Sequence, residues 1–515
     1  MATMAGGGVA RVEQFDGFRV VEIGGEPYAR GRQHGVALRP EIRTLRDRLY
    51  RDIIFRRGRA VGAGFSGVLY AILTRMHPFI PRELRAEMQG VADGAGVAYR
   101  DILLVNCFDD VLHTLGRIGP LVAPIVQHRF VAQVIERANM RRQPATRAAT
   151  ADGAATHEVV GHRAVAHGAV AHGEVAHGEV AHGAVATGAV ATESATRGAF
   201  ACSSFVLTGD RSAAGGPIHG RNLDYAVHDD FIDPDNIVPT TLRETLTVFV
   251  VRPERGEPFA AVGWPGFVGL VTAMNGAGIS LACMTSTVAR ETPNGTPLLL
   301  LYRLVAQYAR SLDEAEWLLR GAKRTIGNNL SVASGREDDG RLFEFTPRRI
   351  ATVRPRDGLL RATNHFQHPW TSEEQAGWVV GSSESRWQRL GELFGAGAAA
   401  EATAGAGGGT VVDAAEAGDI AASAFLAETG ATAASAIAAR AIDADAARAA
   451  LVDTCRIAGA QSDWDCLQNP GTVYGTVAEP ARLALSVRAH DRPDRAWVEL
   501  DLSDALRPLR ENAVA

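Results

Sequence analysis

The sequence predicts an α+β fold in which antiparallel sheet packs against helices. Three observations support this prediction: the first 140 residues have mostly helical periodicity, strand patterns dominate after residue 202, and two helices separate two groups of strands. Strands followed by helices and then by strands again are typical of α+β proteins and not of βαβ repeats. Neither a GxGxxG nor a Walker sequence is present, which disfavours the nucleotide-binding folds.

The N-terminal segment, residues 1–140, is predicted to be mainly helical. A short strand is expected at residues 20–23. A helix or helix pair follows over residues 28–57, where apolar residues recur at helical spacing among many arginines, namely Val36, Ile42, Leu45, Leu49 and Ile53. Further helices are expected at residues 81–95, which end in glycines suited to a helix stop, and then at residues 99–113 and 122–142.

Two low-complexity blocks interrupt the chain. Residues 141–201 contain five copies of a pentapeptide of the type Ala-His-Gly-Ala-Val, which places four histidines five residues apart, at positions 167, 172, 177 and 182. Because this spacing matches neither a helix face nor a strand face and bulky residues are scarce, we interpret the block as a linker. A histidine-rich metal tract is the alternative. Residues 395–443, rich in Ala and Gly, are expected to be a surface insertion.

Residues 202–394 and 444–515 are expected to form the folded core. Alternating apolar runs separated by turn residues predict strands, at 203–208, 218–222, 246–252, 259–263, 266–275, 278–284, 329–333, 341–345, 350–353, 471–478, 483–487 and 495–500. Helical spacing predicts helices at 297–310, 312–322, 382–394 and 446–455. Asn275 precedes Gly276 and is expected to shape a turn.

Composition and charge argue against several classes of partner. The formal net charge is −5 and no long basic run occurs, which argues against nucleic acid and membrane surfaces. The five cysteines are odd in number and lack CxxC spacing, as expected of reduced cysteines in a cytoplasmic protein with no metal or cofactor site. We found no export signal in the first residues and no apolar run long enough to span a membrane.

The stretch around residue 202 indicates a reactive site. A strand that begins at Cys202 and a strand that ends at Asp224 flank a Gly-rich turn, which predicts a β-hairpin. The start of the first strand then lies beside the end of the second. Cys202 is therefore expected to meet Arg221 and Asp224, whereas Cys107, Cys283, Cys455 and Cys466 are expected to be core residues.

A nucleophilic cysteine needs help with its proton. It attacks carbonyl groups as a thiolate, a form that a cationic neighbour such as Arg221 favours. A base is also required, and His219 and His365 are candidates, although spacing ties neither to Cys202. The alternative base is the α-amine that cleavage of the Ala201–Cys202 bond would free, a group whose pKa is about 7.7 to 8.0 in model peptides. Asp224 would then hold the ammonium form.

The ordered motifs of the chain resemble a known family. They are similar to those of N-terminal-nucleophile cysteine hydrolases of the acyl-coenzyme A:6-aminopenicillanate acyltransferase type, and more distantly to those of bile-salt hydrolases and acid ceramidases. In the first part the resemblance rests on Tyr28, Gly31, Gly35, Met88, Gly90, Gly94, Leu104 and Asn106. In the second part it rests on Cys202-Ser203-Ser204, Gly220-Arg221-Asn222-Leu223-Asp224, Met274-Asn275, Glu344-Phe345-Thr346-Pro347, Thr363-Asn364-His365 and Ser382-Ser383 with Arg386.

The resemblance implies a four-layer αββα sandwich, made as a precursor that cleaves itself between Ala201 and Cys202. The cleaved N-terminal chain would remain as the partner in a heterodimer. Cys202 would be the nucleophile and, through its amine, the base. Arg221 and Asp224 would orient it, Asn364 would donate a hydrogen bond to the oxyanion, and Arg386 would support the site electrostatically.

The expected activity is that of an amidohydrolase or acyltransferase acting on a linear amide, non-peptide or small peptide, through an acyl-thioester at Cys202. The substrate would be a small N-acyl amide, an acyl-CoA or another acyl donor. The acyl group would pass to water in a hydrolase or to an amine in a transferase, and the sequence does not decide between these two acceptors. Two differences from bile-salt hydrolases stand out: the hairpin turn over residues 209–216 is longer, and Thr285 stands where an asparagine is common. The alternative is a protein without catalytic activity: either a binding protein that holds metal in its histidine tract or an unprocessed pseudoenzyme on the same fold.

Overall fold

A computed structural model of the chain describes residues 9–56, 58–115, 117, 202–225, 237–375, 381–395, 441–454, 463–492 and 494–507. All of them belong to one compact unit, which excludes residues 120–194. The helix expected at 122–142, the linker at 141–201 with its histidine tract, Ala201, Cys455 and nearly all of the 395–443 insertion lie outside the described residues. The expected domain boundaries at 140 and 201 therefore stay predictions.

The larger of two sheets has nine strands. In spatial order they are β1 (Arg11–Gln14), β2 (Arg19–Gly25), β5 (Thr247–Pro253), β6 (Phe259–Gly263), β7 (Thr272–Asn275), β8 (Ile279–Thr285), β9 (Asn328–Ser334), β10 (Asp339–Phe345) and β11 (Ile350–Val353). Neighbours are antiparallel except for β2 and β5, which run parallel. Strands such as β5 are apolar on both faces because both faces are covered.

The smaller sheet has six antiparallel strands. Their order is β12 (Leu359–Ala362), β3 (Ser203–Leu207), β4 (Ile218–Asp224), β13 (Thr472–Glu479), β14 (Ala484–Ala489) and β15 (Val498–Asp501). The hairpin predicted around residue 202 is confirmed as β3 and β4, with Ser203 opposite Asn222 and Ser204 opposite Arg221. β13 pairs with the other side of β4, so a strand from near the C-terminus lies next to this hairpin.

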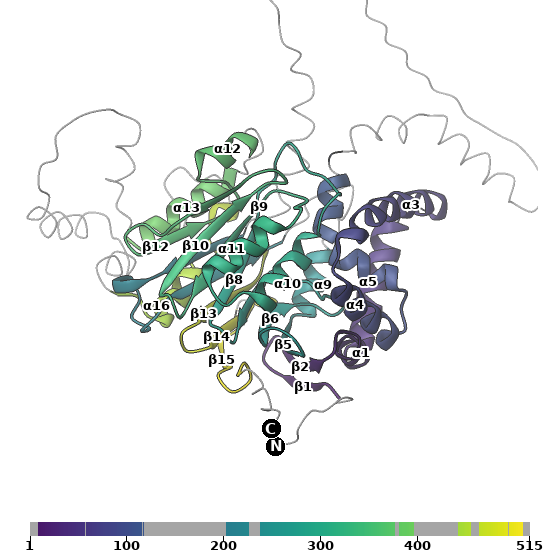
Figure 1. Cartoon of the computed structure of the whole chain (residues 1–515), viewed down its shortest axis with the longest axis horizontal. Coiled ribbons are helices and arrows are strands. Elements are labelled where there is room, and N and C mark those ends of the chain that lie inside the picture. Colours follow the sequence, from purple (N-terminus) through teal and green to yellow (C-terminus); the bar gives the residue numbers. More distant parts are fainter. Residues whose placement is uncertain are drawn as a thin grey trace, which may run out of the picture. The chain divides into compact units, whose positions relative to one another are not determined.

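The layers confirm the expected αββα architecture (Figure 1). Helices α10 (Leu298–Tyr308) and α11 (Leu312–Gly321) pack on the nine-stranded sheet, and α13 (Gly381–Leu393) and α16 (Ala444–Leu451) pack on the six-stranded sheet. The two sheets face each other through contacts of β3 with β8 and β9. Helix α11 begins as expected, because the Ser311 hydroxyl accepts a hydrogen bond from the Glu314 amide at 3.1 Å.

The N-terminal segment supplies most of the remaining helices. They are α1 (Pro27–Ala37), α2 (Arg39–Arg48), a π-helical turn (Leu49–Ile54), α3 (Arg59–Met76), α4 (Arg82–Ala95) and α5 (Tyr99–Asn106). Two short helices lie later in the chain, α9 (Ile237–Glu244) and α12 (Pro369–Gln375). The helix pair expected over residues 28–57 is confirmed as α1 and α2, whereas α3, α9 and α12 were not anticipated by the sequence analysis.

The buried face of α1 differs from the expected one. Val36 is 45% exposed, although its spacing predicted a buried position. Instead α1 presents Gly31 and Gly35 to Gly90 and Gly94 of α4, and a Cβ added at Gly31 would lie 2.0 Å from the Glu87 carbonyl oxygen. The two helix backbones therefore approach too closely for a side chain at these positions. The contact face of α1 is determined by its glycines and not by apolar side chains.

The N-terminal segment is also part of the sheet. β2 pairs with β5 along its full length, from Arg19 opposite Thr247 to Gly25 opposite Pro253, and β1 pairs with β2. A main-chain ladder therefore joins residues before the expected cleavage site to residues after it. The description of this segment as mainly helical is correct but incomplete.

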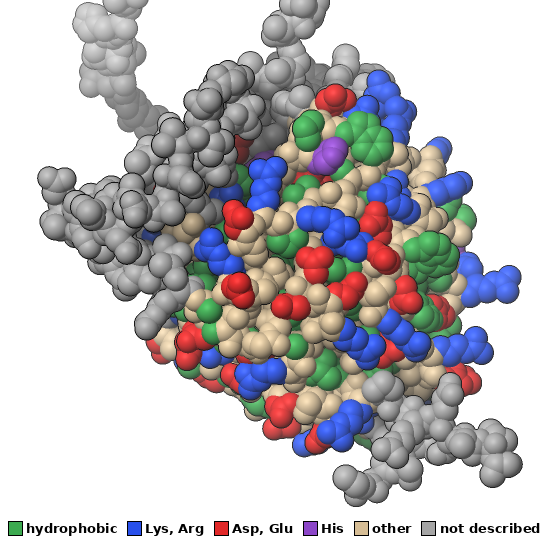
Figure 2. Space-filling view, turned by 60° about the vertical axis from the view of Figure 1, so that its left-hand side comes forward, with side chains coloured by type: hydrophobic (Ala, Val, Ile, Leu, Met, Phe, Trp, Pro, Cys, Tyr) green, Lys and Arg blue, Asp and Glu red, His purple; other side chains and the backbone are tan. Residues whose placement is uncertain are grey.

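On the face seen in Figure 2, basic and acidic side chains are interspersed and form no large area of one sign. Within the described ranges no helix combines the length and apolarity needed to cross a bilayer. The same ranges contain no group of three or more His, Cys, Asp or Glu side chains arranged to hold a metal ion.

Candidate active site

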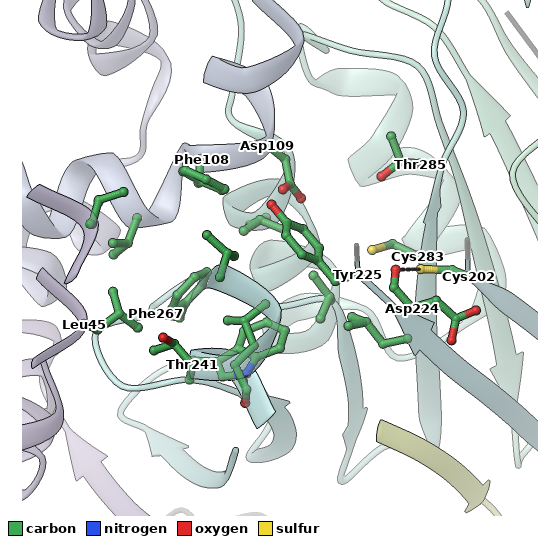
Figure 3. A pocket seen from close by; sticks show the side chains of 18 of the residues that line it. Leu45, Phe108, Asp109, Cys202, Asp224, Tyr225, Thr241, Phe267, Cys283 and Thr285 are labelled. Carbon is green, nitrogen blue, oxygen red and sulfur yellow. Dashed lines mark hydrogen bonds between the residues drawn. The ribbon is translucent and has the colours of Figure 1, made fainter. Parts of the chain in front are cut away.

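The hairpin brings the predicted nucleophile beside the predicted charged residues. Cys202 immediately precedes β3, is 4% exposed, and lies next to the end of β4. The Arg221 Nη2 is 3.5 Å from the Cys202 sulfur, and the thiol lies 3.7 Å from the main-chain carbonyl oxygen of Asp224. The contact with Asp224 is thus made by its backbone and not by its carboxylate (Figure 3).

Arg221 is a buried cation surrounded by neutral acceptors. Its guanidinium donates to the Thr272 hydroxyl, to the Tyr474 hydroxyl at 2.9 Å and to the Cys283 carbonyl oxygen at 3.0 Å, and it lies over the Tyr474 ring. No carboxylate in the described part of the chain forms an ion pair with it. Its positive charge is therefore directed at the Cys202 sulfur without a competing anion in contact, an arrangement that stabilises negative charge on that sulfur.

Asp224 is held in place by side chains of β13 and the turn before it. Its carboxylate accepts hydrogen bonds from the Thr472 hydroxyl at 2.6 Å and from the Asn469 amide at 2.8 Å. Burial raises the pKa of Asp224 to about 6, although the nearby Arg386 and these two hydrogen bonds favour the ionised form. The carboxylate is thus oriented, buried and ionised at neutral pH.

Arg386 and Asn364 meet at the start of β3. Arg386, on α13, is fully buried and donates to the Cys202 carbonyl oxygen, to the Ser203 hydroxyl at 2.9 Å and to the Asn364 Oδ1 at 3.0 Å. The Asn364 amide donates to the Thr285 carbonyl oxygen at 2.8 Å. Asn364 does not line the pocket described below, so the structure links it to Cys202 through Arg386.

Neither candidate histidine contacts Cys202. His219 lies between the sheets, where it is hydrogen bonded to Ser204, Ser280 and Ser331, and burial lowers its pKa to about 3. His365 bonds to the side chains of Thr363 and Ser383, and burial lowers its pKa to about 4. Both imidazoles are satisfied by structural hydroxyl groups and belong to the packing of the fold.

Cys202 opens into a largely apolar pocket (Figure 3). The N-terminal segment contributes Leu45, Leu49 and Phe108 to its lining, and later parts of the chain contribute Leu242 and Phe267. Arg221, Asp224, Cys283 and Thr285 close the end at which the nucleophile lies. A site of this kind suits the apolar part of a small ligand, with a few polar groups to orient it.

Several residues of the site were missed by sequence reasoning. Asn469 and Thr472 hold Asp224, and Tyr474 holds Arg221, but all three are about 250 positions away along the chain. The signal in the sequence was the Asn-Pro-Gly turn that starts the strand β13. Cys283 was assigned to the core; it is buried, as expected, but its side chain also lines the pocket, and burial raises the pKa of this thiol to about 12.

Asn275 has the turn role predicted for it. Its Oδ1 accepts hydrogen bonds from the amides of Ala277 and Ile279, and its Nδ2 donates to the carbonyl oxygens of Ala306 and Ala309 at the end of α10. The residue shapes the β7–β8 turn and ties it to the helix. It lies outside the site.

Comparison with known families supports the resemblance inferred from the motifs. Residues 233–403 match the family model of acyl-coenzyme A:6-aminopenicillanic acid acyl-transferase, which confirms the expected relationship over about a third of the chain. The matched region contains Asn364 and Arg386. It begins after Cys202, Arg221 and Asp224, so the match does not include these three residues.

Two curated relatives match parts of the chain. An uncharacterized protein of Archaeoglobus fulgidus is 23% identical over 385 residues, which make up 69% of this chain and 51% of that protein. Protein dcd1A of Dictyostelium discoideum is 28% identical over 111 residues, 18% of this chain and 25% of that protein. The chain therefore spans about half the length of the first relative and a quarter of the second.

Among solved structures, three amide hydrolases align with the chain at a TM-score of 0.32 each. The ortholog of N-acylethanolamine-hydrolyzing acid amidase from Caenorhabditis elegans is 15% identical and covers 54% of this chain and 93% of its own. Penicillin V acylase from Agrobacterium tumefaciens is 17% identical, covering 59% and 88%. Conjugated bile acid hydrolase from Clostridium perfringens is 11% identical, covering 59% and 95%.

Proposed function

We propose that this chain, which matches the acyltransferase family over residues 233–403, is an autoprocessed N-terminal cysteine amidohydrolase or acyltransferase that acts on linear amides. The observation that carries the proposal is the position of Cys202. Its sulfur lies at the start of β3, 3.5 Å from an arginine that contacts no described carboxylate, and it opens into an apolar pocket. Among the described residues no imidazole contacts that sulfur, which favours a base carried by Cys202 itself.

Processing would begin with the Cys202 thiol and the carbonyl group of Ala201. The sulfur attacks the carbonyl carbon, the peptide C–N bond breaks, and the nitrogen of Cys202 takes the proton of the thiol. Water then hydrolyses the thioester, which gives the carboxylate of Ala201 and restores the thiol. The two chains would remain together as a heterodimer, because β2 of the first chain is hydrogen bonded along its length to β5 of the second.

The freed amine would then serve as the base for the substrate reaction. It accepts the thiol proton, and the thiolate attacks the amide carbonyl with Arg221 beside the sulfur. The Cys202 ammonium, oriented by Asp224, returns the proton to the departing amine as the tetrahedral intermediate collapses to an acyl-thioester. Water completes hydrolysis, or an amine acceptor completes acyl transfer, and either step restores the free enzyme.

Asn364 and Arg386 would support the transition state from the other side of Cys202. Arg386 fixes the Cys202 carbonyl and Ser203 and so holds the nucleophile at its place on β3. The amide nitrogen of Asn364 carries two hydrogens, and the Thr285 carbonyl is its one acceptor among the described residues. Arg386 contacts both the Asn364 Oδ1 and the Cys202 carbonyl oxygen and so keeps Asn364 near the nucleophile. The second hydrogen is proposed to meet the oxyanion of an acyl group bound at Cys202, a contact that typically contributes about 10²- to 10³-fold in rate.

The experiment that tests this function traps the acyl-thioester. Purified enzyme is incubated with N-acyl amides of increasing chain length, quenched in acid and analysed by mass spectrometry of its peptides. We expect an acyl adduct on Cys202 that neutral hydroxylamine removes, and release of free acid or of acylated amine acceptor. The variant C202A should show no adduct and no turnover.

A matched control uses the second cysteine of the same pocket. C283A removes a thiol that burial keeps protonated, so acylation at Cys202 should persist in this variant. Turnover that survives in C202A, or an adduct that forms on Cys283 in the wild type, contradicts the proposal.

A further inference from the structure

Asp109 is an acidic residue of the pocket that the proposed reaction does not use. It follows the end of α5 in a helical stretch over residues 108–115 and lines the pocket together with Phe108. Its side chain points into the same space as those of Tyr225 and Thr285 (Figure 3). No hydrogen-bond donor and no ion-pair partner contacts its carboxylate in the part of the chain that the structure describes.

The neighbouring acid, Asp110, shows what a structural carboxylate looks like at this place. Asp110 accepts hydrogen bonds from the Leu298 amide at 3.1 Å and from the Thr325 hydroxyl, so it caps the first turn of α10. It does not line the pocket. Packing of the fold therefore accounts for Asp110 and leaves Asp109 without a structural role.

The other charged groups near the pocket are already engaged. Arg48 donates to the Thr241 hydroxyl at 2.8 Å and pairs with Glu244 at 2.7 Å. Asp224 is held by Thr472 and Asn469, as described above. The charge of His113 lowers the pKa of Asp109 and so favours its ionised form, but His113 is itself paired with Glu291 at 2.9 Å. Asp109 is thus the charged pocket residue that still lacks a contact.

An unpaired carboxylate among apolar walls costs free energy unless a ligand satisfies it. Burial raises the pKa of Asp109 to about 6, so the group is still mostly ionised at neutral pH. It also lies close to the reacting end of the pocket: burial is the main cause of the raised pKa of Cys283, and the charge of Asp109 is a smaller cause of the same sign. A strongly polar group facing a cleft without a partner is a candidate for substrate recognition.

We propose that Asp109 is a specificity-determining residue that binds a cationic group of the substrate, an ammonium or guanidinium, close to the scissile amide. The apolar walls, with Leu45, Leu49 and Phe267 among them, would hold the uncharged remainder. The preferred substrate is therefore an amphiphilic N-acyl amide with one positive charge. This inference rests on the proposed function for the reaction at Cys202, and it adds the charge that the substrate carries.

The test compares substrates that differ only in one charge. One pair places the charge on the amine side, N-octanoyl-butylamine against N-octanoyl-1,3-diaminopropane. The other places it on the acyl side, the p-nitroanilides of heptanoic and 6-aminohexanoic acid. We expect the wild type to prefer the cationic member of one pair by about 10- to 100-fold in kcat/KM, the range of a hydrogen bond to a charged group. The pair that shows the preference locates the cation.

Two variants decide whether Asp109 is responsible. D109N keeps the size of the side chain and removes its charge, and its ratio of kcat/KM for the cationic and the neutral substrate should fall at least about tenfold below that of the wild type. D93N removes the charge of an exposed carboxylate of α4 and should leave the preference unchanged. Absence of any preference in the wild type, or a preference that persists in D109N, overturns the assignment.

A binding measurement separates this inference from the proposed function. Octylammonium and octanol are titrated calorimetrically into the wild type, D109N and D93N. Octylammonium should bind about tenfold more weakly to D109N than to the other two, with octanol unaffected. Charge-selective binding without acylation of Cys202 rejects the proposed reaction alone. Acylation without charge-selective binding rejects the role of Asp109 alone.

Discussion

Two clusters of buried arginines in this protein differ in how their charge is compensated. In the first, Arg30 of α1 and Arg303 of α10 share the carboxylate of Glu87 on α4, at 2.6 Å and 3.0 Å, and each of the three side chains is at most 2% exposed. In the second, Arg221 and Arg386 are equally buried but contact hydroxyl, carbonyl and amide oxygens and the Cys202 sulfur.

Under the proposed function, this difference separates a cluster that stabilises the fold from one that supports the reaction at Cys202. Burying a cation is costly, and a carboxylate at contact distance lowers that cost but also consumes the positive field. The Arg30–Glu87–Arg303 cluster ties three helices together, with one carboxylate in direct contact with both guanidinium groups. Arg221 and Arg386 contact no carboxylate among the described residues. Apart from the nearby Asp224, their field would be available to negative charge that develops on Cys202 and on a bound acyl group.

Replacing Arg221 is expected to have the largest effect. R221M keeps the length of the side chain but removes the charge beside the sulfur, so kcat/KM should fall by about 10²- to 10³-fold. Steady-state kinetics on a neutral N-acyl amide measure the loss. The corresponding change in the Arg30–Glu87–Arg303 cluster, R303M, should alter kcat/KM by no more than about threefold in the folded enzyme. If R221M and R303M lowered kcat/KM equally, the two arginine clusters would not differ in their contribution to catalysis.

The converse experiment removes the carboxylate that compensates the structural cluster. E87Q leaves two buried arginines without an anion, and the free energy of unfolding should fall by about 3–5 kcal/mol. Urea denaturation followed by circular dichroism measures this change. Acylation of Cys202, counted per folded molecule, should stay normal. A stable E87Q protein would show that the charge of Glu87 is not needed to hold α1, α4 and α10 together.

A smaller effect is expected from the Ser203 hydroxyl, which accepts a hydrogen bond from Arg386. S203A removes the acceptor at 2.9 Å but leaves the contact of Arg386 with the Cys202 carbonyl, so one hydrogen bond of about 1 kcal/mol is lost. The rate of chain cleavage and kcat/KM should each fall about fivefold. S334A, which alters a serine of β9 away from Cys202, is the matched control and should leave both rates unchanged.

The smallest effect concerns the pH dependence. The pKa of Asp224 is raised to about 6, so the carboxylate becomes protonated below that pH and can no longer hold the Cys202 ammonium. We therefore expect kcat/KM to decline as the pH falls through about 6. The Thr472 hydroxyl favours the ionised form, so T472V should move this decline to higher pH, whereas T472S should not. If T472V and T472S gave the same pH profile of kcat/KM, the decline near pH 6 would not be due to Asp224.

Local patterns in the sequence were sufficient to predict the central hairpin. Alternation of apolar residues and a Gly-rich turn fix the pairing of β3 with β4, and that pairing places Cys202 beside Arg221. Most strands and helices of the core were also predictable, since their buried faces follow the periods of 2 and 3.6 residues. Asn364 and Arg386 were indicated by the family resemblance, through Thr363-Asn364-His365 and through Ser382-Ser383 with Arg386.

Long-range pairing explains what the sequence did not reveal. Asn469 and Thr472 reach Asp224 only because β13 pairs with β4 across about 250 residues, and β2 enters the large sheet only by pairing with β5. The contact face of α1 was mispredicted because glycines, which carry no hydrophobic signal, form it. Asp109 lay in a correctly predicted helical stretch, but its exposure to the pocket depends on tertiary packing.

The central claim is that Cys202 becomes the first residue of a second chain, and the intact mass of the purified wild type tests it most directly. Cleavage between Ala201 and Cys202 predicts two chains of about 21 kDa and about 33 kDa, in proportion to their lengths, with Cys202 at the N-terminus of the larger one. C202A should remain a single chain of 54.6 kDa. An active enzyme that stays full length, or one that is cut at another bond, would contradict the account.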